Sequence, residues 1–165
     1  MLRSLVAISV LISTVPSVAA CHGLSLPHEA VIVRPFAPVG RFGGHWGVDV
    51  AAAPGSDVRA IGAGTVSFAG SVAGRRSVTI DHGGGLRTSY SYLAGISAEV
   101  GRTVAPGSPI GTAGVHDGTS AFHLSLRIGT TYVDPLVLGW CSDVPEPALW
   151  LATASHEYPV VRDRN

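Results

Sequence analysis

The chain has 165 residues, which is the size of one ordinary domain and enough to form a stable core by itself. Hydrophobic residues make up 46% of the chain and charged residues only 13%, which is typical of a globular protein. The 11 Lys and Arg residues balance the 11 Asp and Glu residues. Because it lacks a basic excess, we do not expect it to bind nucleic acid or, through its charge, an anionic membrane.

Residues 1–20 are typical of an export signal. Arg3 provides the positive charge, residues 5–11 form an apolar run shorter than a membrane span, and residues 18–20 are small, as residues before a cleavage site are. We expect the mature chain to begin at Cys21, with a formal charge of 10 − 11 = −1 after the loss of Arg3. The expected location is therefore outside the cell or in the cell envelope.

Cys21 admits two interpretations. Residues 18–21 resemble the lipobox of bacterial lipoproteins, in which the cysteine is acylated, and acylation would tether the protein to a membrane. Alternatively, Cys21 pairs with Cys141 in a disulfide, which an oxidising exterior permits. The pair would hold the N-terminal segment, residues 21–30, beside the C-terminal tail. Membrane attachment is expected only if Cys21 is lipidated.

Residues 31–138 have the pattern of short strands separated by tight turns. Brief alternating runs are bounded by glycine or proline, as in half-buried strands. Three consecutive glycines, residues 83–85, predict a hairpin turn between two of these runs. The predicted strands are residues 57–60, 65–68, 77–81, 86–92, 103–104, 109–111 and 122–128. No helical periodicity is sustained, so we expect one all-β domain of antiparallel strands, a β-sandwich or a partly open barrel.

The tail, residues 139–165, differs from the domain in composition. Pro145, Pro147 and Pro159 interrupt it, and one short helical turn is expected near residues 148–154. The tail carries no repeat and no group of residues with a recognisable chemistry.

A histidine and a carboxylate four residues apart stand out near the start of the predicted domain. His45 and Asp49 flank the sequence Trp-Gly-Val, and both side chains are of types that bind divalent metals. Two ligands do not make a catalytic zinc site, which needs three from the protein and one position for water. The meaning of the pair therefore depends on a third ligand elsewhere in the chain.

The order of motifs resembles the M23 peptidase family, which includes the lysostaphin-like and LytM-like peptidoglycan endopeptidases. The resemblance spans roughly residues 34–138 without large gaps. It includes the sequences at residues 44–49, 53–55, 58–60, 64–66, 69–70, 78–83, 88–93, 100–111, 123–124 and 134–136. It implies a LytM-like β-sheet domain with a groove, a zinc cofactor and peptidoglycan peptides as the substrate.

The resemblance also implies a ligand set. In this family zinc is bound by the His and Asp of an HxxxD motif and by the second His of a late HxH motif, which gives His45 and Asp49 as ligands here. The late motif is aligned with residues 123–125, so that Ser125 stands at the third ligand position and His123 at the catalytic one. Since serine is a poor zinc ligand compared with imidazole, we expect zinc to be weakly bound or absent.

A second departure from the family lies at Tyr92, where the family has a histidine that helps to orient water or stabilise the oxyanion. A phenol can donate a hydrogen bond but is not a cation at neutral pH. His45 and Asp49 then either bind metal weakly or form a hydrogen-bonded pair, and in one alternative His123 takes the third metal position. His82 and His116 are not expected to be ligands, although a mobile His116 side chain could reach the groove.

Three functions follow from these observations. We first expect a catalytically degenerate, exported M23-like domain that binds peptidoglycan peptides or regulates a cell-wall amidase. The alternative is an active zinc endopeptidase with an altered ligand set, which the retained histidines favour and Ser125 opposes. The third is a structural envelope domain with a vestigial groove.

Overall fold

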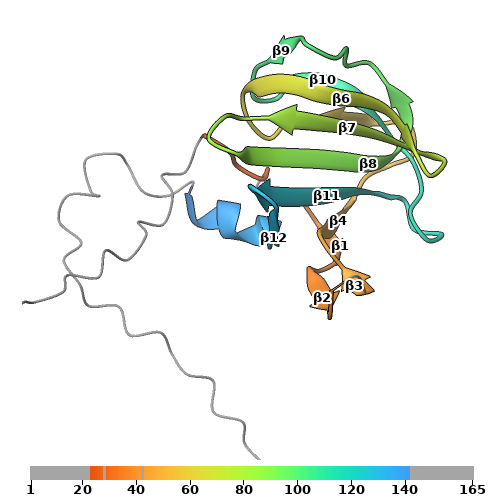
Figure 1. Cartoon of the computed structure of the whole chain (residues 1–165). Coiled ribbons are helices and arrows are strands. Elements are labelled where there is room, and N and C mark those ends of the chain that lie inside the picture. The colour runs from red at the N-terminus through yellow and green to blue at the C-terminus, as the bar shows by residue number, and fades with distance from the viewer. Residues whose placement is uncertain (1–22, 28, 42, 142–165) are drawn as a thin grey trace, which may run out of the picture.

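The computed structural model describes residues 23–27, 29–41 and 43–141 of the chain (Figure 1). The predicted export signal, Cys21 and the predicted helical turn at residues 148–154 lie outside the described residues, and so does the side chain of Cys141. Among the described residues, no helix is long and apolar enough to cross a membrane.

The domain is built almost entirely from antiparallel strands, as the sequence predicts. The strands are β1 (Ile32–Arg34), β2 (Ala37–Val39), β3 (Gly43–His45), β4 (Val48–Ala51), β5 (Asp57–Arg59), β6 (Gly64–Val72), β7 (Arg75–Asp81), β8 (Leu86–Ile96), β9 (Thr103–Val104), β10 (Pro109–Ala113), β11 (Ala121–Ile128) and β12 (Thr131–Val133). A 3-10 helix, η1 (Pro135–Cys141), follows them. The all-β prediction is confirmed, whereas β1 to β4, β12 and η1 were not predicted from the sequence.

Ten of the strands form one sheet in the order β1-β4-β11-β8-β7-β6-β9, with β5, β10 and β12 branching from this path. Strand β8 is the longest and pairs with β7 and β11 along its length and with β10 near its end (Figure 1). The hairpin between β7 and β8 turns at residues 83–85, where all three glycines have positive φ. A separate two-stranded sheet, β2 and β3, carries His45 at its end.

The central strands are two-faced, and this positions the site. On β7, β8 and β11, side chains of one face fill the core, including Val78, Ile80, Tyr90, Leu124 and Leu126. Because side chains alternate along a strand, the residues between them point to the opposite face. That second face carries His123 and a set of short hydroxyl side chains.

Candidate metal centre and groove

Three strands bring His45, Asp49 and His123 together. His45 ends β3 and Asp49 is the second residue of β4, with a two-residue bend between the strands. His123 lies on β11 directly opposite Asp49 in the antiparallel pairing of β11 with β4. The close contact between Asp49 and His123 is therefore set by strand register, and the contact with His45 by the short connection from β3.

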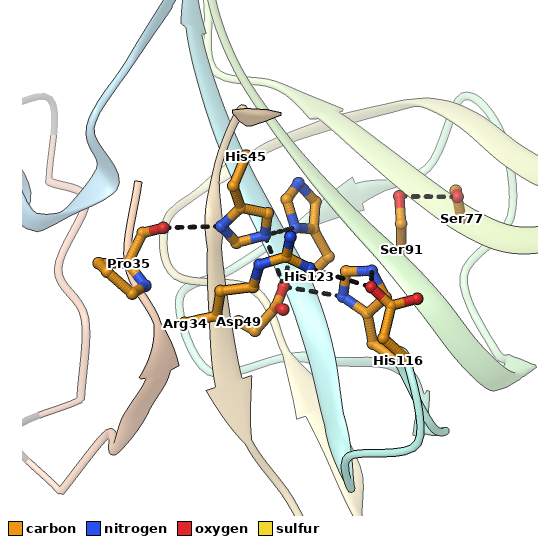
Figure 2. Close-up of polar contacts among 9 residues, drawn as sticks. Arg34, Pro35, His45, Asp49, Ser77, Ser91, His116 and His123 are labelled. Atoms are coloured by element: carbon orange, nitrogen blue, oxygen red, sulfur yellow. Dashed lines mark hydrogen bonds and ion pairs between the residues drawn. The ribbon is translucent and has the colours of Figure 1, made fainter. Parts of the chain in front are cut away.

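The atoms that could bind a metal converge on one point (Figure 2). His45 Nε2 lies 3.0 Å from Asp49 Oδ1 and 3.0 Å from His123 Nδ1, and His123 Nδ1 lies 2.9 Å from Asp49 Oδ1. His45 and Asp49 are buried, and the His123 side chain is 16% exposed. These separations are close to the edge of about 3.4 Å expected for a tetrahedral zinc with bonds near 2.1 Å.

Hydrogen bonding around His45 indicates that a cation fits this point. Its Nδ1 lies 2.7 Å from the carbonyl oxygen of Pro35, and because a carbonyl only accepts, Nδ1 must donate (Figure 2). In the neutral imidazole, Nε2 then presents a lone pair toward the carboxylate of Asp49. The Nε2 lone pair and Asp49 Oδ1 are both acceptors, and because they lie 3.0 Å apart they need a proton or a metal ion between them. In metal-bound histidines the other ring nitrogen commonly donates to a carbonyl, as His45 Nδ1 does to Pro35.

A fourth side chain, His116, joins the group, which the sequence did not lead us to expect. It comes from the connection between β10 and β11 and is 5% exposed. One ring nitrogen each of His45, His116 and His123 and one oxygen of Asp49 all lie within 4.8 Å of one another. The only signal for this placement in the sequence is the Asp117–Gly118 pair, which predicts a tight turn beside the histidine.

At both Asp49 and His123, burial shifts the pKa one way and the contact between the two residues shifts it the other way. Burial raises the pKa of the Asp49 carboxyl, but contacts with His123, His116 and His45 outweigh burial and leave the pKa below its ordinary value. For His123, burial lowers the pKa more than the bond to Asp49 raises it. Asp49 is therefore ionised and His123 neutral near pH 7, which are the forms that bind metal.

Ser125 lies outside this group. It is two residues beyond His123 on β11, about 7 Å along the strand, and it pairs with Ser89 rather than with a residue of β4. The resemblance puts Ser125 at the third ligand position, and in the structure the side chain that lies beside His45 and Asp49 is that of His123. His82 also lies elsewhere, with its ring nitrogens 2.6 Å from the carbonyl of Ala63 and 2.8 Å from Thr88 Oγ1.

Tyr92 lies beside the group rather than within it. Its ring stacks on His116 with centroids 3.5 Å apart and is 6.4 Å from the ring of His123. The backbone of Tyr92 has a φ of 63°, which is rare for a bulky residue and is often found where a side chain is held for function.

A groove extends from this group of three histidines and Asp49, called the metal-ligating group below because it could hold a metal ion, over the outer face of the sheet. Two rows of hydroxyl side chains cross its floor, in register with His123 and Ser125. Ser77 donates to Ser91 over 2.9 Å, and Thr79 and Ser89 are 2.9 Å apart. The groove has a volume of about 260 Å³, and its sides are lined by Trp46, Phe68, Val72 and Tyr132. A neutral, hydroxyl-lined floor between apolar sides suits an extended peptide.

Comparisons with known proteins agree with this architecture. The sequence profile of Peptidase family M23 matches residues 43–135. The uncharacterized protein Rv2891 of Mycobacterium tuberculosis is 44% identical over 103 residues, which cover 58% of this chain and 41% of Rv2891. The chain thus matches less than half the length of this relative.

Two solved structures are similar to the chain. One is a mutant of the catalytic domain of the prophage-encoded M23 protein EnpA from Enterococcus faecalis, with a TM-score of 0.59, 25% identity, and coverage of 70% of this chain and 95% of that domain. The other is a zinc-containing peptidase from Vibrio cholerae, with a TM-score of 0.57, 25% identity, and coverage of 68% and 37%.

Proposed function

Because the chain belongs to peptidase family M23, we propose that it is a zinc-dependent peptidase that acts on the peptides of peptidoglycan, with His45, Asp49 and His123 as its metal ligands. The observation that carries the proposal is the convergence of their three ligand atoms within 3.0 Å, with the Nδ1 proton of His45 directed away to Pro35. The groove beside them supplies a place for the peptide.

This ligand set shifts the alignment with the family by two residues. If His123 is the metal-binding histidine of the late motif, the first histidine of that motif corresponds to Ala121, which is fully buried on β11. The departures from the family then fall at Ala121 and Tyr92, and not at a ligand. We therefore attribute the missing imidazoles to the catalytic positions and regard the ligands as complete.

The residues of the site have separable tasks. Zinc, when bound, polarises a peptide carbonyl and lowers the pKa of water. Pro35 fixes the tautomer and direction of His45, and the register of β4 and β11 fixes Asp49 against His123. The hydroxyl rows orient the peptide through its backbone, and the Tyr92 phenol is a hydrogen-bond donor available near the reacting carbonyl.

A second candidate function is favoured by the absent imidazoles at Ala121 and Tyr92. A groove that binds stem peptides without rapid cleavage would act as a binding domain or as a regulator of a cell-wall amidase. Both candidates place the protein outside the cytoplasm, so the proposal includes the export signal at residues 1–20 and leaves Cys21 either acylated or paired with Cys141. Intact mass of the exported protein distinguishes these two states.

Metal content tests the ligand assignment. We expect one zinc per purified chain, loss of zinc in His123→Ala, and unchanged zinc in Ser125→His, because a side chain at position 125 starts about 7 Å along the strand from position 123. Zinc binding that appears only in Ser125→His would show that the serine is a lesion in the ligand set and would refute the assignment.

Cleavage tests the activity. Release of peptides from purified peptidoglycan by the zinc-loaded protein, lost in His123→Ala, is the result expected of a peptidase. A zinc-loaded protein that binds peptidoglycan, releases nothing and accelerates a cognate amidase would instead establish the second candidate.

A further inference from the structure

His116 is held at the end of a tight turn. Its backbone N–H and carbonyl both bond to Thr119 over 2.9 Å, and between them Asp117 and Gly118 have φ values of 49° and 80°. Two successive residues with positive φ are the mark of a type I′ turn, for which an Asp-Gly pair is favoured. The turn therefore fixes the backbone of His116 beside the other residues of the metal-ligating group and does not leave it on a loose loop.

The two ring nitrogens of His116 face different surroundings. Nδ1 is buried and lies at ion-pair distance from Asp49 Oδ1, 2.9 Å, but it makes no hydrogen bond. Nε2 faces the carboxylate of Asp117 at 3.6 Å, and Asp117 in turn accepts a hydrogen bond from Arg34 over 3.0 Å. An unpartnered buried nitrogen is costly unless it binds something.

This arrangement repeats the pattern found at His45. In both residues one nitrogen points into the group. The other nitrogen of His45 bonds to the Pro35 carbonyl over 2.7 Å, and that of His116 faces the exposed Asp117 carboxylate at the longer, ion-pair distance of 3.6 Å. Metal-bound histidines typically have such an oxygen on their second nitrogen. We propose that His116 is a fourth protein ligand of the zinc bound by His45, Asp49 and His123, an inference that rests on the proposed zinc site.

The distances define what this ligation requires. The separations that involve His116 reach up to 4.8 Å, wider than the edge of about 3.4 Å in a tetrahedral site, so the ring must turn further toward His45 and His123. Its stacking on the Tyr92 ring permits this, because stacked rings can slide in their planes. Four protein ligands close the position that a hydrolytic zinc keeps for water. Peptide or water reaches the metal only when His116 leaves it.

Coordination of the bound metal tests the inference directly. X-ray absorption of the zinc-loaded full chain should show three imidazoles and one carboxylate. The matched variant is His116→Phe, which keeps a flat ring against Tyr92 but has no nitrogen to offer. In it we expect two imidazoles, a new water oxygen and a zinc affinity lower by more than about tenfold, measured by competition with a chromophoric chelator.

Cobalt substitution gives a second readout, and its result for the wild type does not depend on whether a variant folds. Solvent proton relaxation by the Co²⁺ protein should be weak in the wild type, because the closed site holds no exchangeable water, and stronger in His116→Phe. As a control, His82→Gln removes a histidine whose nitrogens bond to Ala63 and Thr88, away from the group, and should change neither measurement.

The outcomes separate the two proposals. Two imidazoles in the wild type, with equal zinc affinity in wild type and His116→Phe, would overturn the role of His116 while leaving the three-ligand site intact. A wild type that binds no zinc, or a His123→Ala variant with undiminished zinc affinity, would overturn the proposed function itself.

Discussion

Gly47 lies within the HxxxD motif at a point where only glycine fits. A Cβ atom at this position would lie 2.6 Å from His123 Nε2 and 2.4 Å from the carbonyl oxygen of Leu124. The φ of Gly47 is not in the left-handed region, so the effect of Gly47→Ala is steric and involves no backbone strain. The Leu124 carbonyl belongs to β11, which is paired with β4, and cannot move independently.

The displacement can be worked from these distances. The contact with His123 Nε2 is about 0.8 Å shorter than the 3.4 Å at which ordinary van der Waals contact begins, so the imidazole or the bend must move by nearly that amount. Metal sites tolerate only about 0.2 Å in their bond lengths. We expect Gly47→Ala to weaken zinc binding by about 10- to 100-fold, which corresponds to about 1.4 to 2.7 kcal/mol.

Chelator competition measures the zinc affinity of Gly47→Ala, and thermal denaturation without zinc checks that the variant is folded. The matched control is Gly70→Ala, where the new Cβ would meet only the exposed side chain of Phe68, at 3.1 Å. We expect wild-type affinity in the control. Wild-type zinc affinity in a folded Gly47→Ala would refute the argument, because it would mean that the position of His123 does not control metal binding.

Three further predictions concern the core and the groove. Burial raises the pKa of Tyr90 to about 12, against about 10 in the unfolded chain. The free energy of unfolding, measured by urea denaturation, should therefore be constant below pH 10 and fall by about 3 kcal/mol towards pH 12. The Tyr90→Phe variant should show no such fall. Leu124→Ala, at a fully buried position, should lower the free energy of unfolding by about 2 to 5 kcal/mol, read from the same urea curves, and a loss below about 1 kcal/mol would contradict the core assignment. Ser91→Leu should fill the groove beside His123 and weaken stem-peptide binding by about tenfold in calorimetry without altering zinc content, and unchanged peptide binding would argue against this groove as the peptide site.

The sequence predicts the β-sheet framework because glycine and alternation are local signals. The hairpin at residues 83–85 and the strands on either side of it are found where they were predicted. Strands β3 and β4, of three and four residues, were not predicted, although the equally short β5 and β9 were. Strand β4 is positioned by pairing with β11, which is distant in the chain, whereas β3 forms a local hairpin with β2.

The ligand set shows where local reasoning ends. His123 and Ser125 lie two residues apart on one strand, so the period of two puts both on the same face and does not tell which one meets Asp49. The register between β4 and β11 decides which residue meets Asp49, and in this register Asp49 lies opposite His123. The position of His116 beside this group was not predicted for a related reason, since its turn is a local signal but the place to which the turn brings the imidazole is not.

The departure from the family at Tyr92 is physically connected with the position of His116. The aromatic ring of Tyr92, 3.5 Å from that of His116 and nearly parallel to it, is the surface against which His116 packs inside the site. Arg75 covers the Tyr92 ring with its guanidinium carbon 5.0 Å from the centroid. A histidine at position 92 would have supplied an imidazole to the reaction but a smaller surface for packing. With tyrosine at position 92 that imidazole is absent, and the larger ring instead packs against the imidazole of His116 and holds it beside the proposed metal site. The site therefore has its third histidine on a turn rather than on a strand, where its release would require only local motion of the loop between β10 and β11.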